Sequence, residues 1–323
     1  MYFLENILSK KNPLWMYVVT VICAFLAANV IGGIPLIIVA LIQITNGNII
    51  STEGLSKMDF SSMGISENLV LFLMLIPFII GLLTLYLCIK YLHGRTFSET
   101  VNGTKRIRWS RIFSGFSVWL LLMFVYFLAS YMISPENFLV QFDVKTFLPL
   151  LFLAIIFIPI QTTFEELLFR GYLGQGVAVW TKNRWFVVMI PAVLFGLMHI
   201  MNPEISTYGV WETMPQYILF GLIFGFIAVL DDGIELSMGM HAANNIFACL
   251  FVTYDNSALK TSAIFKQDVV NMQAETIVLL VAGLLAIWFF AKKYKWNLSV
   301  MNKRIKPVQQ INKETCTEMQ END

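Results

Sequence analysis

Titratable side chains within the apolar segments of this sequence are concentrated between residues 161 and 245. An ionisable group inside a membrane-spanning helix costs roughly 2.5–3.5 kcal/mol on insertion, so its presence indicates a functional position. Two of the three histidines fall in this stretch, whereas His93 lies at a basic edge and is expected to be a solvated surface residue. The chemistry of the protein is therefore predicted to lie between Gln161 and Asn245.

The first candidates are two adjacent glutamates, Glu165 and Glu166, followed one helical turn later by Arg170. In a helix Glu166 and Arg170 share a face, whereas Glu165 points about 100° away. We therefore expect Glu166 and Arg170 to neutralise each other and Glu165 to face a cavity. A carboxylate in such a partly dry site can act as a general base. The competing interpretation is that both glutamates belong to a structural ion-pair network.

Two further pairs each bring side chains together over one helical turn. Phe195 and His199 share a face, and His241 and Asn245 present a ring nitrogen and an amide to the same point. Alone, each pair could simply join packed helices by hydrogen bonds. Together with Glu165, the polar members supply what amide hydrolysis needs, which is a base for water and donors for the oxyanion.

A bundle of membrane helices must hold these groups. Of the 323 residues, 57% are hydrophobic and only 13% are charged, against about 25% charged in an average soluble domain. Lipid offers the backbone no hydrogen-bond partner, so apolar runs of about 20 residues are expected to be helices. The prediction is an all-α, polytopic membrane helix bundle, one integral membrane domain over 1–323, with about eight transmembrane helices. The segments are Leu14–Ile44, Leu69–Leu92, Ile112–Ile133, Phe147 to about Trp180, Trp185–Met201, Gln216–Leu230, Ile234–Tyr254 and Thr276–Ala291.

The ends and edges of these segments carry further information. Lysine and arginine crowd the chain before the first segment and the links after the second, fourth and eighth, which predicts that both termini are cytoplasmic. The first segment is too long for one straight span and must tilt or break. The polar tail, 297–323, is expected to be mobile. A net charge of +1 indicates no basic face for nucleic acid.

The cysteines predict neither a zinc cluster nor a redox pair, because no two are closely spaced. They are Cys23, Cys88, Cys249 and Cys316.

The three polar motifs resemble a known family. Their patterns are Glu-Glu-x-x-x-Arg at 165–170, Phe-x-x-x-His at 195–199 and His-x-x-x-Asn at 241–245. They are similar to the motifs of the CAAX prenyl protease and bacteriocin-processing (CPBP, Abi-type) family of intramembrane proteases, with no departure at the motif positions. The resemblance covers the stretch 161–245 and implies an endopeptidase that works within the bilayer.

The resemblance also implies roles for single residues. Glu165 would activate water and His199 would help to hold it. His241 and Asn245 would stabilise the tetrahedral oxyanion. The supporting residues would be Glu166, Arg170 and Phe195.

Whether a metal takes part is left open by the sequence. There is no His-Glu-x-x-His motif, yet Glu165, His199 and His241 could in principle hold a divalent ion such as Zn²⁺. The alternatives are thus a metalloprotease and a metal-free, glutamate-dependent protease.

Bacterial relatives of this family are linked to peptide maturation and to self-immunity to bacteriocins. We therefore expect a membrane-associated protein or peptide as the substrate and a multi-pass position in a bacterial cell membrane. Two other classes compete with the protease. A transporter or channel could use the same polar groups as a path for protons or metal ions, although the two halves show no matched broken helices. A non-catalytic scaffold could regulate a membrane partner.

Overall fold

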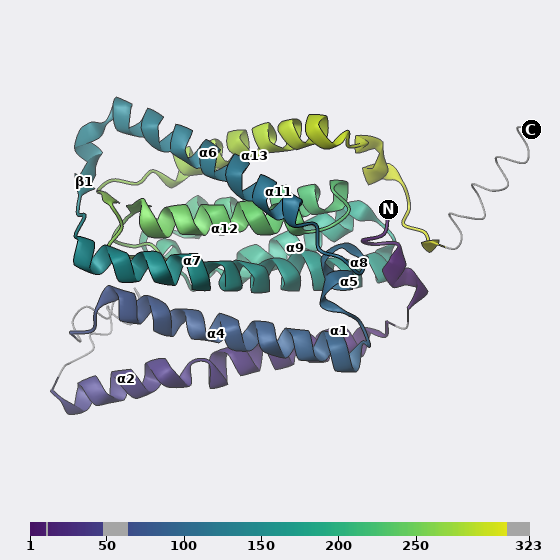
Figure 1. Ribbon diagram of the computed structural model, residues 1–323, viewed down its shortest axis with the longest axis horizontal. Helices are drawn as coiled ribbons and strands as arrows, with labels where there is room; N and C mark the ends of the chain where they lie inside the picture. Colours follow the sequence, from purple (N-terminus) through teal and green to yellow (C-terminus); the bar gives the residue numbers. More distant parts are fainter. Residues whose placement is uncertain (11, 48–63, 309–323) are drawn as a thin grey trace, which may run out of the picture.

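The computed structural model describes residues 1–10, 12–47 and 64–308, which form a helical bundle with a small sheet at one end (Figure 1). Six helical segments of this part of the chain are long and apolar enough to cross a membrane. The predicted membrane helix bundle is confirmed in this coarser form. The six segments are Leu14–Thr45, Glu67–Leu92, Trp109–Ile133, Val144–Thr181, Val210–Leu230 and Met272–Tyr294.

The other two predicted segments form shorter helices. α9 (Arg184–Met198) has 15 residues and α12 (Glu235–Leu250) has 16, both below the length of an ordinary span. Most residues of α12 are buried inside the protein. The expected count of eight spans is therefore not confirmed, and the cytoplasmic location of both termini stays a prediction.

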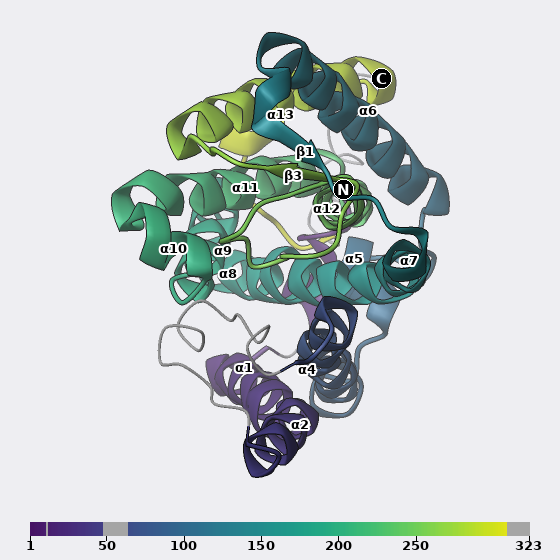
Figure 2. The ribbon, with the colours of Figure 1, turned by 90° about the vertical axis from the view of Figure 1, so that its left-hand side faces the viewer.

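The central helix of the bundle is α12, which carries His241 (Figure 2). It packs against α6 (Trp109–Ile133), α7 (Val144–Glu166) and α11 (Val210–Leu230). α11 in turn packs against α9 and α13 (Met272–Tyr294). Side chains on α12 are thus enclosed by protein, which is where polar groups of a membrane bundle belong.

The N-terminal helices form a separate layer on the outer side of α7 (Figure 2). α1 (Leu14–Leu26) continues into the π-helical stretch η2 (Ala27–Ile31) and, after two glycines, into α2 (Ile34–Thr45). The long first segment is therefore interrupted, as its length predicted. α4 (Glu67–Leu87), extended by the π-helical η4 (Cys88–Leu92), packs against η2 and α7 and joins this layer to the core.

Two glycines allow α6 and α12 to approach closely. A Cβ built on Gly239 would lie 2.0 Å from the Ile112 carbonyl oxygen, and one on Gly115 would lie 2.3 Å from the Leu236 carbonyl oxygen. Both neighbouring atoms belong to the backbone, so rotating a side chain could not relieve the clash. Small residues at such crossings let membrane helices gain van der Waals contact.

The glycine crossing gives a first prediction. Gly239→Ala should destabilise the fold by about 1–3 kcal/mol, because overpacking forces the two backbones apart. Thermal unfolding of the detergent-solubilised protein measures this, with Gly174→Ala as the control, since a Cβ there has its nearest neighbour at 3.6 Å. Equal stability of the two variants would contradict the expectation.

The small sheet was not predicted from the sequence. It consists of β1 (Phe138–Val140), β2 (Val252–Thr253) and β3 (Phe265–Gln267) in the order β1-β3-β2. β1 runs antiparallel to β3 and follows the short 3₁₀ helix η5 (Pro135–Asn137), whereas β2 runs parallel to β3. The sheet joins the links between α6 and α7 and between α12 and α13, which are distant in sequence.

The first residues of the chain are tied to the body of the protein. They include the 3₁₀ helix η1 (Asn6–Ser9), which lies near α5 (Phe97–Asn102). Glu5 forms a buried ion pair with Arg184 at the start of α9.

The polar tail expected over 297–323 divides in two. Its first part forms the 3₁₀ helix η7 (Leu298–Asn302), and Met301 and Ile305 are buried against the bundle. The remainder, 309–323, lies outside the described residues, as does Cys316. The other three cysteines are free thiols.

His93 is not the solvated surface residue that the sequence predicted. Its Nε2 is 2.6 Å from the Tyr172 hydroxyl and its Nδ1 is 2.9 Å from the Arg95 guanidinium. Burial, together with the Arg95 cation, lowers the pKa of His93 to about 4. The ring is therefore neutral and structural at physiological pH. The prediction was wrong because the partner of the ring, Tyr172, is distant in sequence, so the contact could not be inferred from neighbouring residues.

Candidate active site

Two adjacent glutamates end α7 and are buried in the bundle. The exposed fraction is 7% for Glu165 and 0% for Glu166. Directly after them the helix widens into the π-helical stretch η6 (Leu167–Leu173), which runs on into α8 (Gly174–Thr181). π-helical turns inside α-helices are frequent at functional sites.

Glu166 is held by an ion pair of the kind that its spacing predicts. The Arg170 guanidinium nitrogen lies 2.9 Å from Glu166 Oε1, and both side chains are buried. The guanidinium carbon of Arg170 also lies 4.2 Å from the centre of the Phe195 ring, within cation–π range. Arg170 therefore neutralises one glutamate and packs on the face of α9 that leads to His199.

His241 lies between the two glutamates. Its Nδ1 is 2.9 Å from Glu166 Oε1, and its Nε2 is 3.6 Å from Glu165 Oε2. A carboxylate paired with Arg170 can only accept, so Nδ1 carries a hydrogen and donates to Glu166. This bond fixes the ring and directs Nε2 toward Glu165.

Asn245 reaches Glu165 through Gln161, a residue outside the three sequence motifs. Gln161 donates from Nε2 to Glu165 Oε1 at 2.7 Å, and Asn245 donates from Nδ2 to Gln161 Oε1 at 3.1 Å. Gln161 precedes Glu165 by one helical turn, and that i, i+4 spacing was the available signal.

His199 reaches the group less directly. It follows the last residue of α9 and is half-buried. Its Nδ1 lies 2.7 Å from the Phe195 carbonyl oxygen, to which it must donate, so Nε2 is left as the free nitrogen. The ring stacks on Tyr217 at 4.3 Å, and the Phe195 ring is 6.0 Å from that of His241. Phe195 is thus the side chain that joins the two histidines.

The arrangement brings a carboxylate, an imidazole and an amide together on α7 and α12, with the second imidazole beside them on α9. Residues 144–247, which include all of these groups, match the family model described as type II CAAX prenyl endopeptidase Rce1-like. Over 250 residues the chain is 33% identical to the uncharacterized protein YyaK of Bacillus subtilis (strain 168), covering 76% of this chain and 81% of that protein. The chain belongs to the Rce1-like family. No solved structure matches it.

Membership of the Rce1-like family implies a peptidase, and the six apolar helices place it in a membrane. The resemblance seen in the motifs is thereby confirmed. The family match runs from residue 144 to residue 247. It therefore extends from α7 into α12 and does not include the N-terminal layer.

The candidate ligands for a metal ion are of a suitable chemical type, but they do not lie close enough together to hold one. Glu165, His199 and His241 would be the ligands, and the Nδ1 contacts leave the Nε2 atoms of both histidines turned away from their anchors. Hydrogen bonds of this type orient metal-binding histidines. Yet among the described residues no three His, Cys, Asp or Glu side chains converge closely enough to hold an ion. In the described arrangement Glu165, His199 and His241 therefore do not form a metal site.

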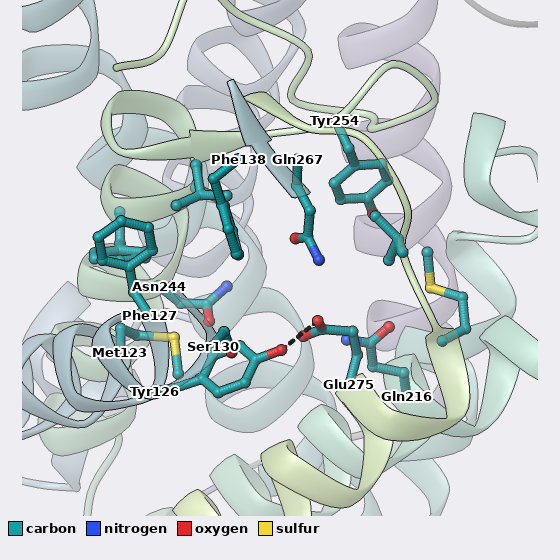
Figure 3. Close-up of a pocket in the computed structure, with 15 residues that line it drawn as sticks. Met123, Tyr126, Phe127, Ser130, Phe138, Gln216, Asn244, Tyr254, Gln267 and Glu275 are labelled. Atoms are coloured by element: carbon teal, nitrogen blue, oxygen red, sulfur yellow. Dashed lines mark hydrogen bonds between the residues drawn. The ribbon is translucent and has the colours of Figure 1, made fainter. Parts of the chain in front are cut away.

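A cavity of about 150 Å³ borders Asn244, the neighbour of Asn245 (Figure 3). Five of its fifteen lining residues are aromatic, among them Phe127 and Phe247. The Tyr126 hydroxyl donates to Glu275 at its rim. None of Glu165, His199, His241 and Asn245 lines it, so the cavity lies beside the candidate site and is not its centre.

Proposed function

We propose that this protein is an intramembrane endopeptidase that hydrolyses a peptide bond of a membrane-associated protein or peptide with water activated by Glu165. One observation carries the proposal. Glu165 Oε2 is buried, has no hydrogen-bond partner among the described residues, and faces His241 Nε2 at 3.6 Å. A buried carboxylate oxygen without a partner is costly unless a substrate or reactant uses it. Oε2 of Glu166 also has no hydrogen-bond partner among the described residues, but the charge of that carboxylate is neutralised by Arg170.

In the proposed reaction the Glu165 carboxylate takes a proton from water as the water oxygen bonds to the carbonyl carbon. The tetrahedral oxyanion then accepts hydrogen bonds from Asn245 and His241. The Asn245 amide has a second hydrogen beyond the one given to Gln161. His241 donates to the oxyanion as the imidazolium, which carries a hydrogen on Nε2 as well as the one that Nδ1 donates to Glu166. His199 would help to hold the water. As the carbon–nitrogen bond breaks, Glu165 returns its proton to the leaving amine.

Glu166, Arg170 and Phe195 have supporting roles in this proposal. Arg170 neutralises Glu166, and Glu166 holds Nδ1 of His241. The Phe195 ring contacts both histidines and Arg170. The two adjacent glutamates are therefore divided into one that is paired and one that remains available as a base.

The proposed substrate is a small peptide in a bacterial membrane, cut either to mature it or to confer self-immunity to a bacteriocin. Membrane peptidomes of cells that make the wild-type protein or Glu165→Gln would identify peptides cut only by the wild type. Such a peptide, labelled with a fluorophore and a quencher, is then offered to purified protein in liposomes. Ion or solute flux without cleavage would favour a transporter, and a phenotype unaffected by Glu165→Gln would favour a scaffold.

Removal of the proposed oxyanion donor gives a second prediction. Asn245→Ala should lower kcat about 10²–10³-fold, the usual loss for one such donor. The Michaelis constant should change little, because the bond strengthens only in the transition state. The liposome assay with the labelled peptide measures both constants. A raised Michaelis constant with normal kcat would assign Asn245 to ground-state binding instead.

A further inference from the structure

A continuous chain of hydrogen bonds ends on Glu165 and crosses three helices. It begins on α6, where Trp119 Nε1 donates to Asn244 Oδ1 at 3.2 Å. On α12, Asn244 Nδ2 donates to Asn245 Oδ1 at 3.1 Å. Asn245 then donates to Gln161 Oε1 on α7, and Gln161 donates to Glu165 Oε1 at 2.7 Å. Every bond of the chain runs in the same direction.

The two ends of the chain fix the orientation of all three amides. The indole nitrogen of Trp119 can only donate, and an ionised carboxylate can only accept. Turning over any one amide would therefore set two donors or two acceptors face to face. Trp119 is fully buried, and Asn245 and Gln161 are 9% and 7% exposed, so water cannot readily repair such a mismatch. Bonds aligned in this way also polarise one another.

The two glutamates are held by chemically different networks. Glu166 is held by the cationic Arg170 and by His241, whereas the Oε1 atom of Glu165 is held by a neutral amide. An amide orients the carboxylate without cancelling its charge. It leaves the second oxygen, Oε2, available on the side of His241.

We propose that Gln161, Asn244 and Trp119 are positioning residues for hydrolysis. Resting on the proposed function, this inference assigns two tasks to the chain. Gln161 fixes the Glu165 carboxylate so that Oε2 points at the reacting water. The bond from Asn245 to Gln161 occupies one amide hydrogen and thereby directs the other at the oxyanion. Trp119 and Asn244 hold the Asn245 amide in the orientation in which one hydrogen bonds to Gln161 and the other points at the oxyanion.

The test compares kcat and KM for cleavage of the labelled peptide by Gln161→Met and by the wild type in liposomes. Methionine keeps the side-chain length but removes both hydrogen bonds of Gln161. We expect kcat to fall about 10–100-fold with little change in KM, as for a misplaced catalytic group. The matched control is Gln216→Met on α11. Gln216 does not belong to the chain of hydrogen bonds, so this variant should behave as wild type.

Trp119→Phe tests the far end of the chain and keeps most of the ring volume. It removes the donor that orients Asn244, so kcat should fall several-fold even though Trp119 does not touch the carboxylate. The control is Trp211→Phe, since Trp211 is 89% exposed. This variant also decides the matter if Gln161→Met fails to fold.

The outcomes separate this inference from the proposed function. Loss of cleavage in Glu165→Gln, with reduced kcat in both Gln161→Met and Trp119→Phe, supports both. Loss in Glu165→Gln, with wild-type kcat and KM in both Gln161→Met and Trp119→Phe, would overturn the positioning role and leave these residues a packing role only. Normal cleavage by Glu165→Gln would overturn the proposed function itself.

Discussion

Glu165→Gln is expected to abolish detectable cleavage, with kcat reduced about 10²–10⁴-fold, the usual contribution of a general base. Glutamine keeps the shape of the side chain and can still bond to Gln161, but it cannot accept a proton from water. Loss of the base should leave the fold intact, because Oε2 has no hydrogen-bond partner among the described residues. Cleavage of the labelled peptide and thermal unfolding, measured on the same preparation, would separate lost chemistry from lost structure.

The matched control is Glu275→Gln, which neutralises another carboxylate within a membrane helix. Glu275 lies on α13 at the rim of the cavity in Figure 3 and accepts from the Tyr126 hydroxyl. It has no part in the proposed machinery, so its variant should cleave the peptide at close to the wild-type rate. Equal activity of Glu165→Gln and Glu275→Gln would remove the reason for assigning the base to Glu165.

Arg170→Met is expected to have the largest effect on stability, about 3–5 kcal/mol, the cost of leaving a buried charge without its partner. Glu166 is fully buried, and the described structure gives it Arg170 and His241 as partners. Removing the guanidinium therefore leaves a carboxylate in a dry interior. The measurement is the free energy of unfolding in mixed detergent micelles.

A double variant checks the cause of that loss. Glu166→Leu together with Arg170→Met removes both charges, so it should recover part of the stability lost in Arg170→Met alone. The coupling energy from the full double-mutant cycle should be favourable to the native pair. Additive effects would show instead that Arg170 contributes mainly through packing on Phe195.

Local spacing predicted much of the candidate site. The pair Glu166 and Arg170, and the shared face of His241 and Asn245, follow from the rise and turn of one helix. The long apolar runs likewise predicted helices, because a bilayer leaves the backbone no other solution. These features need no knowledge of which helices are neighbours.

Partners on different helices could not be predicted in the same way. The contacts of Trp119 with Asn244 and of Gln161 with Asn245 each join residues more than 80 positions apart in sequence, and no periodicity indicates them. The small sheet has the same origin, since β1 pairs with β3, which follows only after all the helices from α7 to α12. The lengths of α9 and α12 were overestimated because apolar residues beyond a helix end look the same in sequence as those within it.

The shortness of α9 has a consequence for the surrounding lipid. With 15 residues it is about 22 Å long, whereas the hydrocarbon core is about 30 Å thick. One face is exposed along its length, including Phe186, Val193 and Leu197, while the neighbouring helices are longer. This hydrophobic mismatch favours a local thinning of the bilayer beside α9. Such thinning would bring the headgroups closer to His199, so we expect the rate of cleavage to depend on the acyl-chain length of the surrounding lipid.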